Sequence, residues 1–108
     1  MFIEIGGKNR KIRFDYNALA DLEQALGQPI QKYFADVSNL GFSFLRILVW
    51  AGLKSSDPGL TLQRAGMLIN QALEEGMDLD TLTRTFLEAL HENRAFKGTS
   101  TEKNVLAE

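Results

Sequence analysis

The sequence predicts a mainly helical α+β protein, in which an N-terminal β-hairpin is followed by about four packed helices. Three observations predict this class. Apolar and polar residues alternate near the N-terminus, which is the period of a half-buried strand. Apolar residues then recur at helical spacing along most of the remaining chain. Glycine, proline and helix-capping residues divide that remainder into segments of helix length.

The hairpin is expected over residues 2–14. Its alternating apolar positions are Ile3, Ile5, Ile12 and Phe14. Between them lies Gly6-Gly7-Lys8-Asn9, and glycine readily adopts the positive φ values of a tight reversal. Because an isolated two-stranded hairpin is only marginally stable, its apolar face must pack against the helices that follow.

Four helices are expected, over about residues 16–26, 42–54, 61–75 and 79–96. Their N-caps are expected to be Asp15 for the first, Thr61 for the third and either Asp78 or Asp80 for the fourth, because such side chains accept hydrogen bonds from the free N–H groups of a first turn. Gly27 and Gly76 are expected to end the first and third helices. Segment 42–54 is apolar on nearly all sides, which is typical of a helix in the middle of a fold or beneath a partner.

A chain of 108 residues fits a single domain, which we expect to span residues 1–97. Residues 30–41 are ambiguous, because their apolar positions fit a broken helical stretch that Gly41 interrupts. From residue 98 to residue 108 the composition is largely polar, and a flexible C-terminal tail is expected there.

Composition excludes several classes of function. The chain has no cysteine, so thiolate chemistry and cysteine metal sites are excluded. Its net charge of −2 argues against nucleic acid as the main partner, since phosphate binding needs a basic excess. The most apolar run, 42–53, contains Arg46 and is too short to span a bilayer. The N-terminus lacks the features of a signal peptide, so no membrane association and a cytoplasmic location are expected.

No group of residues predicts catalysis, a metal or a cofactor. Glu88 and His91 have the spacing that supplies two ligands in di-metal bundles, but the second copy of that motif is missing. The acidic run from Glu74 to Asp80 lacks the fixed ligand positions of a calcium loop. His91, the one histidine, has no evident acid–base partner. The sequence therefore predicts a protein that is not an enzyme.

Two motif-like features have simpler explanations. Gly6-Gly7-Lys8 lies between two strands, whereas a phosphate-binding loop joins a strand to a helix. The third and fourth helices superficially resemble a helix-turn-helix. However, Asp78 and Asp80 at the start of the fourth helix would repel DNA.

Two charged features remain open. The residues of the one basic cluster are Lys8, Arg10, Lys11 and Arg13. This cluster is best explained as a solvated strand face, with an acidic partner or the acidic 74–92 stretch of a second copy as alternatives. Arg46 lies within the most apolar helix, so it extends to solvent, pairs with Asp21 or Glu23, or marks a face that a partner covers.

The order of these features resembles a known family. The opening resemblance lies in Ile5-Gly6-Gly7-Lys8, then Ile12-Arg13-Phe14-Asp15, then Leu22-Glu23-Gln24-Ala25-Leu26-Gly27. It continues in Leu45-Arg46-Ile47-Leu48-Val49-Trp50-Ala51-Gly52-Leu53, Asp57-Pro58 and Leu60-Thr61-Leu62. Over about residues 3–75 the chain is similar to the small tail-module proteins of gene transfer agents and to phage tail assembly chaperones.

The resemblance implies a chaperone that coats the long helical tape measure protein, or another tail component, during tail morphogenesis. A helical client needs an apolar groove. The residues expected to contact this partner are Phe42, Phe44, Arg46, Trp50 and Leu53, although the aromatic and aliphatic ones equally suit a core. A homo-oligomer is a further possibility. The alternatives are a structural, tube-associated tail protein and, less favoured, a small DNA-binding regulator.

Overall fold

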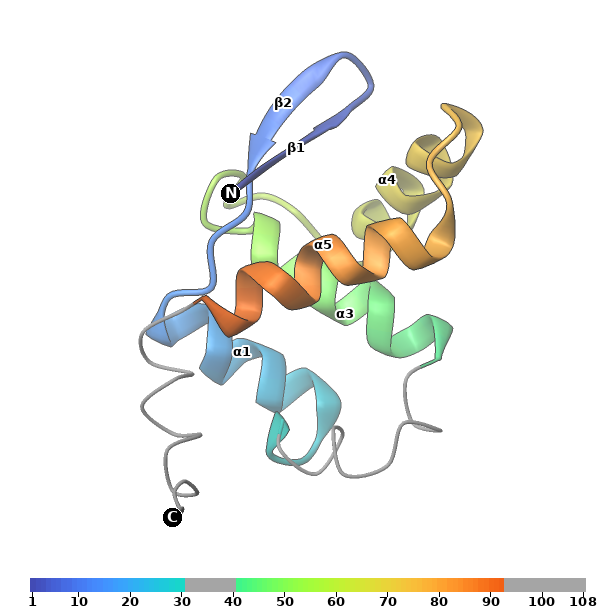
Figure 1. Ribbon diagram of the computed structural model, residues 1–108. Coiled ribbons are helices and arrows are strands. Elements are labelled where there is room, and N and C mark those ends of the chain that lie inside the picture. The colour runs from blue at the N-terminus through green and yellow to red at the C-terminus, as the bar shows by residue number, and fades with distance from the viewer. Residues whose placement is uncertain (31–40, 93–108) are drawn as a thin grey trace.

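A computed structural model of the protein describes residues 1–30 and 41–92 and confirms the mainly helical α+β class. The antiparallel strands β1 (Phe2–Ile5) and β2 (Lys8–Lys11) come first. They precede α1 (Tyr16–Leu26), α3 (Phe42–Leu53), α4 (Leu62–Glu74) and α5 (Leu79–His91). Helix α3 is central, because it packs against α1, α4 and α5 (Figure 1).

The hairpin turn is tighter than the sequence suggested. Ile5 pairs directly with Lys8, so the loop consists of Gly6 and Gly7 alone. Both glycines have positive φ, 66° and 73°, as a two-residue type I′ turn requires. Lys8 and Asn9 therefore belong to β2 rather than to the turn.

The strand ladder is also shorter than the predicted 2–14 hairpin. It ends at Lys11, and the chain then continues to α1. The Ile12 N–H donates to the Met1 carbonyl, and the Arg13 N–H donates to the Gly52 carbonyl on α3, each over 2.8 Å. The Gly52 carbonyl thus replaces a strand partner for Arg13 where the chain leaves the ladder. Ile12 and Phe14, on either side of Arg13, are still buried in the core.

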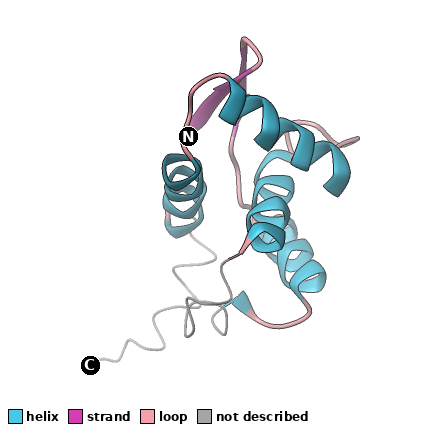
Figure 2. Cartoon of the chain, turned by 90° about the vertical axis from the view of Figure 1, so that its right-hand side faces the viewer, coloured by secondary structure: helices cyan, strands magenta, loops and turns pink. Residues whose placement is uncertain are grey.

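The tip of the hairpin is attached to the end of α4. The Gly6 N–H donates to both carboxylate oxygens of Glu75, over 2.9 and 3.1 Å. A Cβ atom on Gly6 would lie 2.6 Å from Nε2 of Gln71, so this contact also depends on glycine. Both views place the strand pair at one end of the group of helices (Figures 1 and 2).

Three helices begin at caps that the sequence predicted. In each cap a side-chain oxygen accepts a hydrogen bond from a backbone N–H group of the first turn. Asp15 Oδ1 accepts from Ala18 (2.9 Å), Thr61 Oγ1 from Arg64 (3.1 Å) and Asp78 Oδ1 from Thr81 (2.6 Å). Gly27 and Gly76 follow α1 and α4 with φ of 79° and 106°, as expected of left-handed helix stops. Of the two candidates for the last cap, the chain uses Asp78.

The helix bounds are close to the expected ones where the structure describes them. Helices α3 and α4 end one residue earlier than predicted, and α4 begins one residue later, because Thr61 is its cap. Helix α5 ends at His91, with Glu92 as its C-cap, whereas the sequence predicted a helix to residue 96. Residues 93–96 themselves lie outside the described residues. The same holds for the expected tail at 98–108 and for most of the ambiguous segment 30–41.

The core is built around α3, as its apolar sequence predicted. Its buried residues are Phe44, Leu45, Leu48, Val49, Ala51, Gly52 and Leu53. Gly52 marks the closest packing. A Cβ atom there would lie 2.8 Å from the Phe14 ring and 3.1 Å from the Phe86 ring. Two large aromatic residues therefore meet α3 at a position without a side chain.

Replacing Asp78 with asparagine should reduce the acid sensitivity of the fold. Hydrogen bonds from the Thr81 hydroxyl and then from the Thr81 N–H hold the pKa of the Asp78 carboxyl below its ordinary value. Its contribution to stability is therefore complete above the unfolded-state pKa and is lost as the pH falls through the lower folded-state pKa. Asparagine caps helices about as well but does not titrate there.

We therefore expect a smaller loss of melting temperature for Asp78→Asn than for wild type between about pH 6 and about pH 3. Circular dichroism melts would measure it. An identical loss of melting temperature in the two proteins would show that the charge of Asp78 does not contribute to the acid sensitivity of the fold.

Candidate protein-binding surface

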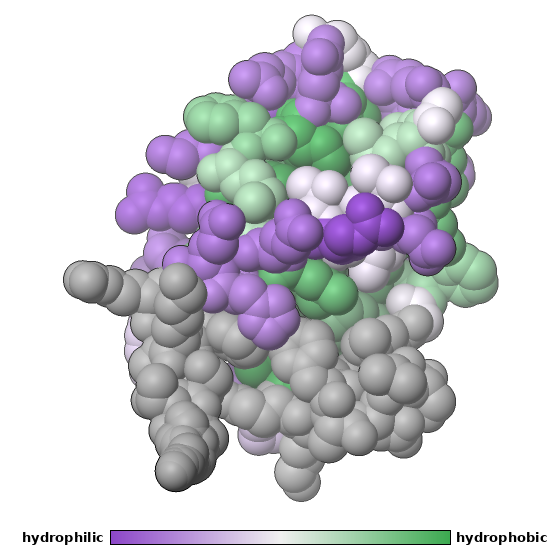
Figure 3. Space-filling view, in the orientation of Figure 1, coloured by the Kyte–Doolittle hydropathy of each residue, from purple (hydrophilic) through white to green (hydrophobic). Residues whose placement is uncertain are grey.

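Large apolar side chains are exposed where α3 begins. The Phe42 side chain is 82% exposed, although it is the first residue of the most apolar helix. Leu73 at the end of α4 and Leu79 at the start of α5 are each 37% exposed. Apolar surface reaches the right-hand edge of the molecule beside the start of α3 (Figure 3). Scattered exposed apolar residues are ordinary, but neighbouring ones around a hollow make this region a candidate binding surface.

Two adjoining hollows flank Phe42. The larger, about 360 Å³, lies between α3 and α4, where Ile69 and Leu73 line it. The second, about 320 Å³, lies between the start of α3 and α5. Both are lined by Phe42, Leu45 and Leu79. We call this continuous surface the α3 groove, defined by Phe42, Leu45, Ile69, Leu73 and Leu79.

Packing of three helices creates the groove. The short connection between α4 and α5 brings Leu73 and Leu79 to the same end of the molecule. On α4, Gly66 faces α3 and leaves room for the Arg46 side chain, whose Cδ would lie 3.4 Å from a Cβ atom at that position. Arg46 therefore extends along the α3–α4 junction and lines the larger hollow.

The position of Arg46 selects among the alternatives left open by the sequence. Arg46 is exposed, so the aliphatic part of its side chain lies on the helix surface and its guanidinium reaches solvent. The two acids considered as its partners are engaged elsewhere. Asp21 forms an ion pair with Lys54 over 2.5 Å, and Glu23 accepts the Ile30 N–H. The Arg46 guanidinium is thus available at the rim of the α3 groove.

The other residues predicted to contact a partner occupy different places. Phe44 is 3% exposed and supports the second hollow from within the core. Trp50 and Leu53 lie at the opposite end of α3, outside the α3 groove. Leu53 is buried, and the half-buried Trp50 donates its indole N–H to the Leu60 carbonyl over 3.1 Å. The predicted set is therefore split, with Phe42 and Arg46 together at the groove.

Sequence reasoning did not single out Ile69, Leu73 and Leu79 as surface residues. Leu73 and Leu79 belong to the apolar residues that recur at helical spacing, and this spacing alone does not show which end of an apolar stripe remains uncovered. The sequence feature that could have identified Leu73 and Leu79 is their location on either side of the short connection between α4 and α5. Two helices joined in this way pack as neighbours, so the end of one stripe lies beside the start of the next.

The acidic residues of this region have structural partners. Glu75 binds the hairpin turn and Asp78 caps α5. Within residues 1–30 and 41–92, no three histidine, cysteine, aspartate or glutamate residues come together in a way that could hold a metal ion. None of the helices in the same residues combines the length and hydrophobicity needed to cross a membrane.

No protein-family model, curated protein or solved structure matches this chain significantly. The fold and the surface thus define the protein as a helix-rich α+β domain with an apolar groove at one end of its central helix.

Proposed function

We propose that the protein is a non-catalytic binding protein whose α3 groove receives an amphipathic helix of another protein. The observation that carries this proposal is the position of Phe42, which is 82% exposed between two apolar hollows. An amphipathic helix places large apolar residues three or four positions apart on one face, and such residues fill neighbouring pockets of a groove.

The shape and charge of the groove indicate what the helix should offer. Each hollow has room for a large apolar side chain of the client. Arg46 at the rim favours a client helix with an acidic residue beside its apolar face. The charge would contribute orientation and specificity more than affinity.

More specifically, we propose that the protein is a tail assembly chaperone of a phage, prophage or gene transfer agent. It would act in the host cytoplasm by keeping the tape measure protein, or another tail component, soluble before the tail tube forms. The resemblance over residues 3–75 and the suitability of the groove for a long helical client support this proposal. The two-stranded sheet of the described residues favours it over a tube subunit, which needs a larger sheet.

The test is co-expression with the tape measure protein encoded by the same element. We expect client that is insoluble alone to remain soluble and to co-purify with this protein. Quantifying client in the soluble fraction and in the affinity eluate measures both effects. Client that aggregates regardless, or that is soluble without this protein, would contradict the chaperone proposal.

A further inference from the structure

A pocket separate from the two hollows of the α3 groove lies at the other end of α3, between β2, the α3–α4 connection and α4. It measures about 230 Å³, below the roughly 300–1,000 Å³ of typical small-molecule sites. Its apolar wall consists of Leu53, Leu60 and Leu68. A pocket of this size suits one side chain of a partner rather than a complete small molecule.

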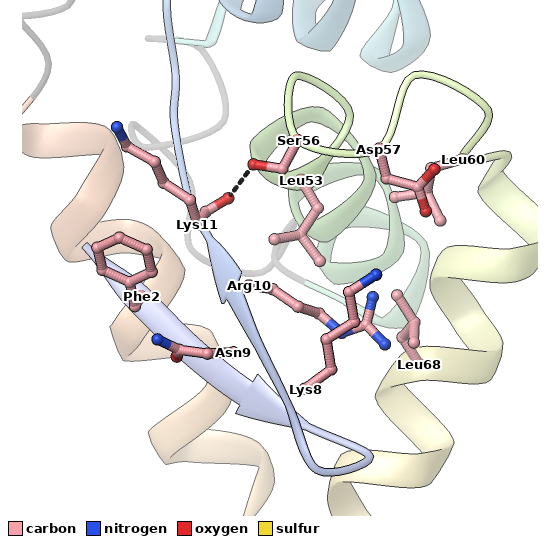
Figure 4. A pocket seen from close by; sticks show the side chains of 10 residues that line it. All are labelled: Phe2, Lys8, Asn9, Arg10, Lys11, Leu53, Ser56, Asp57, Leu60 and Leu68. Atoms are coloured by element: carbon pink, nitrogen blue, oxygen red, sulfur yellow. Dashed lines mark hydrogen bonds between the residues drawn. The ribbon is translucent and has the colours of Figure 1, made fainter.

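Two cationic side chains share this pocket. Lys8 and Arg10 are alternate residues of β2 and therefore point to the same face of the hairpin. Their side chains run together toward Leu68 on α4. Lys11 also lines the pocket, but its side chain points away, on the opposite face of the strand (Figure 4). Asp57 also lines the pocket, but it forms no ion pair with Lys8 or Arg10. Positive charge therefore collects here without a paired carboxylate.

Arg10 carries the most specific signal. Its Nε atom is buried and has no hydrogen-bond acceptor among the described residues. A buried donor without an acceptor is costly, and such donors are uncommon in native proteins. An arginine fork pairs well with a carboxylate, which accepts two parallel hydrogen bonds. Arg10 thus brings to the pocket a guanidinium group that suits a carboxylate, beside a second cation, Lys8, that would add attraction.

We infer that this pocket binds a carboxylate side chain, above all glutamate, in an acidic segment of a partner protein. The leucine wall accommodates the methylene groups of glutamate, and Lys8 and Arg10 hold its carboxylate. The chain's net charge of −2 makes a protein carboxylate a better partner than a nucleic acid, whose binding requires a broad basic surface. This site is separate from the α3 groove, so it does not depend on the proposed function.

The experiment follows the Arg10 side chain directly by NMR. The Nε–Hε resonance of Arg10 is recorded in the ¹⁵N-labelled full chain during titration with a capped hexaglutamate peptide. We expect this resonance and the amides of residues 53–60 to shift in a saturable way. Capped hexaglutamine, a dT6 oligonucleotide and inorganic phosphate are titrated in parallel.

Three variants make the test specific. Arg10→Gln and Lys8→Gln should each weaken hexaglutamate binding about tenfold, the effect of losing one charge-assisted hydrogen bond. Lys11→Gln removes the same charge from the opposite face of the same strand and should leave binding unchanged. Thermal melts of all three variants establish that they fold, and the residue 53–60 amides report binding where Arg10 is absent.

Several outcomes would overturn the inference. These are no shift with hexaglutamate, an equal shift with hexaglutamine, or an equal loss in Lys11→Gln. Stronger binding of phosphate would assign the pocket to a free anion. Stronger binding of dT6 would assign it to nucleic acid.

Discussion

Replacing Phe86 with alanine should lower the free energy of unfolding by about 3–5 kcal/mol, the usual cost of removing a buried phenylalanine ring. Phe86 is fully buried on α5 and packs against the Gly52 position of α3. Because a small domain is stable by only about 5–15 kcal/mol, this single change should remove a large part of the total. Urea unfolding followed by circular dichroism at 222 nm would measure it.

Gly52 provides a check on the reason for this effect. In an ordinary helix, glycine to alanine stabilises by about 1 kcal/mol. Here we expect Gly52→Ala to destabilise instead, by about 1–3 kcal/mol, because its Cβ would collide with the rings of Phe14 and Phe86. In the Phe86→Ala background the cost of Gly52→Ala should be smaller. Strictly additive effects would show that these residues are not in the contact described.

Replacing Phe42 with alanine should have the opposite profile, with little effect on stability and a large effect on client capture. The side chain is 82% exposed, so the free energy of unfolding should change by less than about 0.5 kcal/mol. As the central aromatic residue of the α3 groove, it should contribute about 2 kcal/mol or more to binding. The measurement is the amount of tape measure protein that co-purifies with the variant, together with its urea unfolding curve.

Phe2→Ala is the matched control for this prediction. Phe2 is also an exposed phenylalanine, at 57%, but it lies on the hairpin and outside the α3 groove. Capture should survive Phe2→Ala and fail with Phe42→Ala. If both variants capture client as wild type does, the groove is not the client site, even if the chaperone role holds.

Much of the fold was predictable because its signals are local. Asp15 and Thr61 were identified as caps from the residue type that precedes each apolar repeat, and Gly27 from its position after one. The central position of α3 followed from its lack of a polar face. The turn was located less well, because Gly6 and Gly7 alone suffice for the reversal, and sequence could not show that Lys8 already pairs with Ile5.

The candidate binding surfaces were less predictable because they depend on how elements meet. A helix that is apolar on nearly all sides does not show which apolar residue remains outside, so Phe42 and Phe44 looked equivalent although one is exposed and the other buried. Likewise, the basic cluster was interpreted as a solvated strand face. The position of α4 and the following connection decides that Arg10 becomes half-buried while Lys11 remains exposed.

The contact between the Gly6 N–H and Glu75 has a consequence for the order in which the chain folds. These residues are 69 positions apart, and β1 packs against α4. The ribosome synthesises the hairpin before α4, so the docking surface of the hairpin does not exist until α4 has emerged. The hairpin should thus be among the last elements to become protected from amide hydrogen exchange, after α3 and α4 have paired through contacts that are closer in sequence.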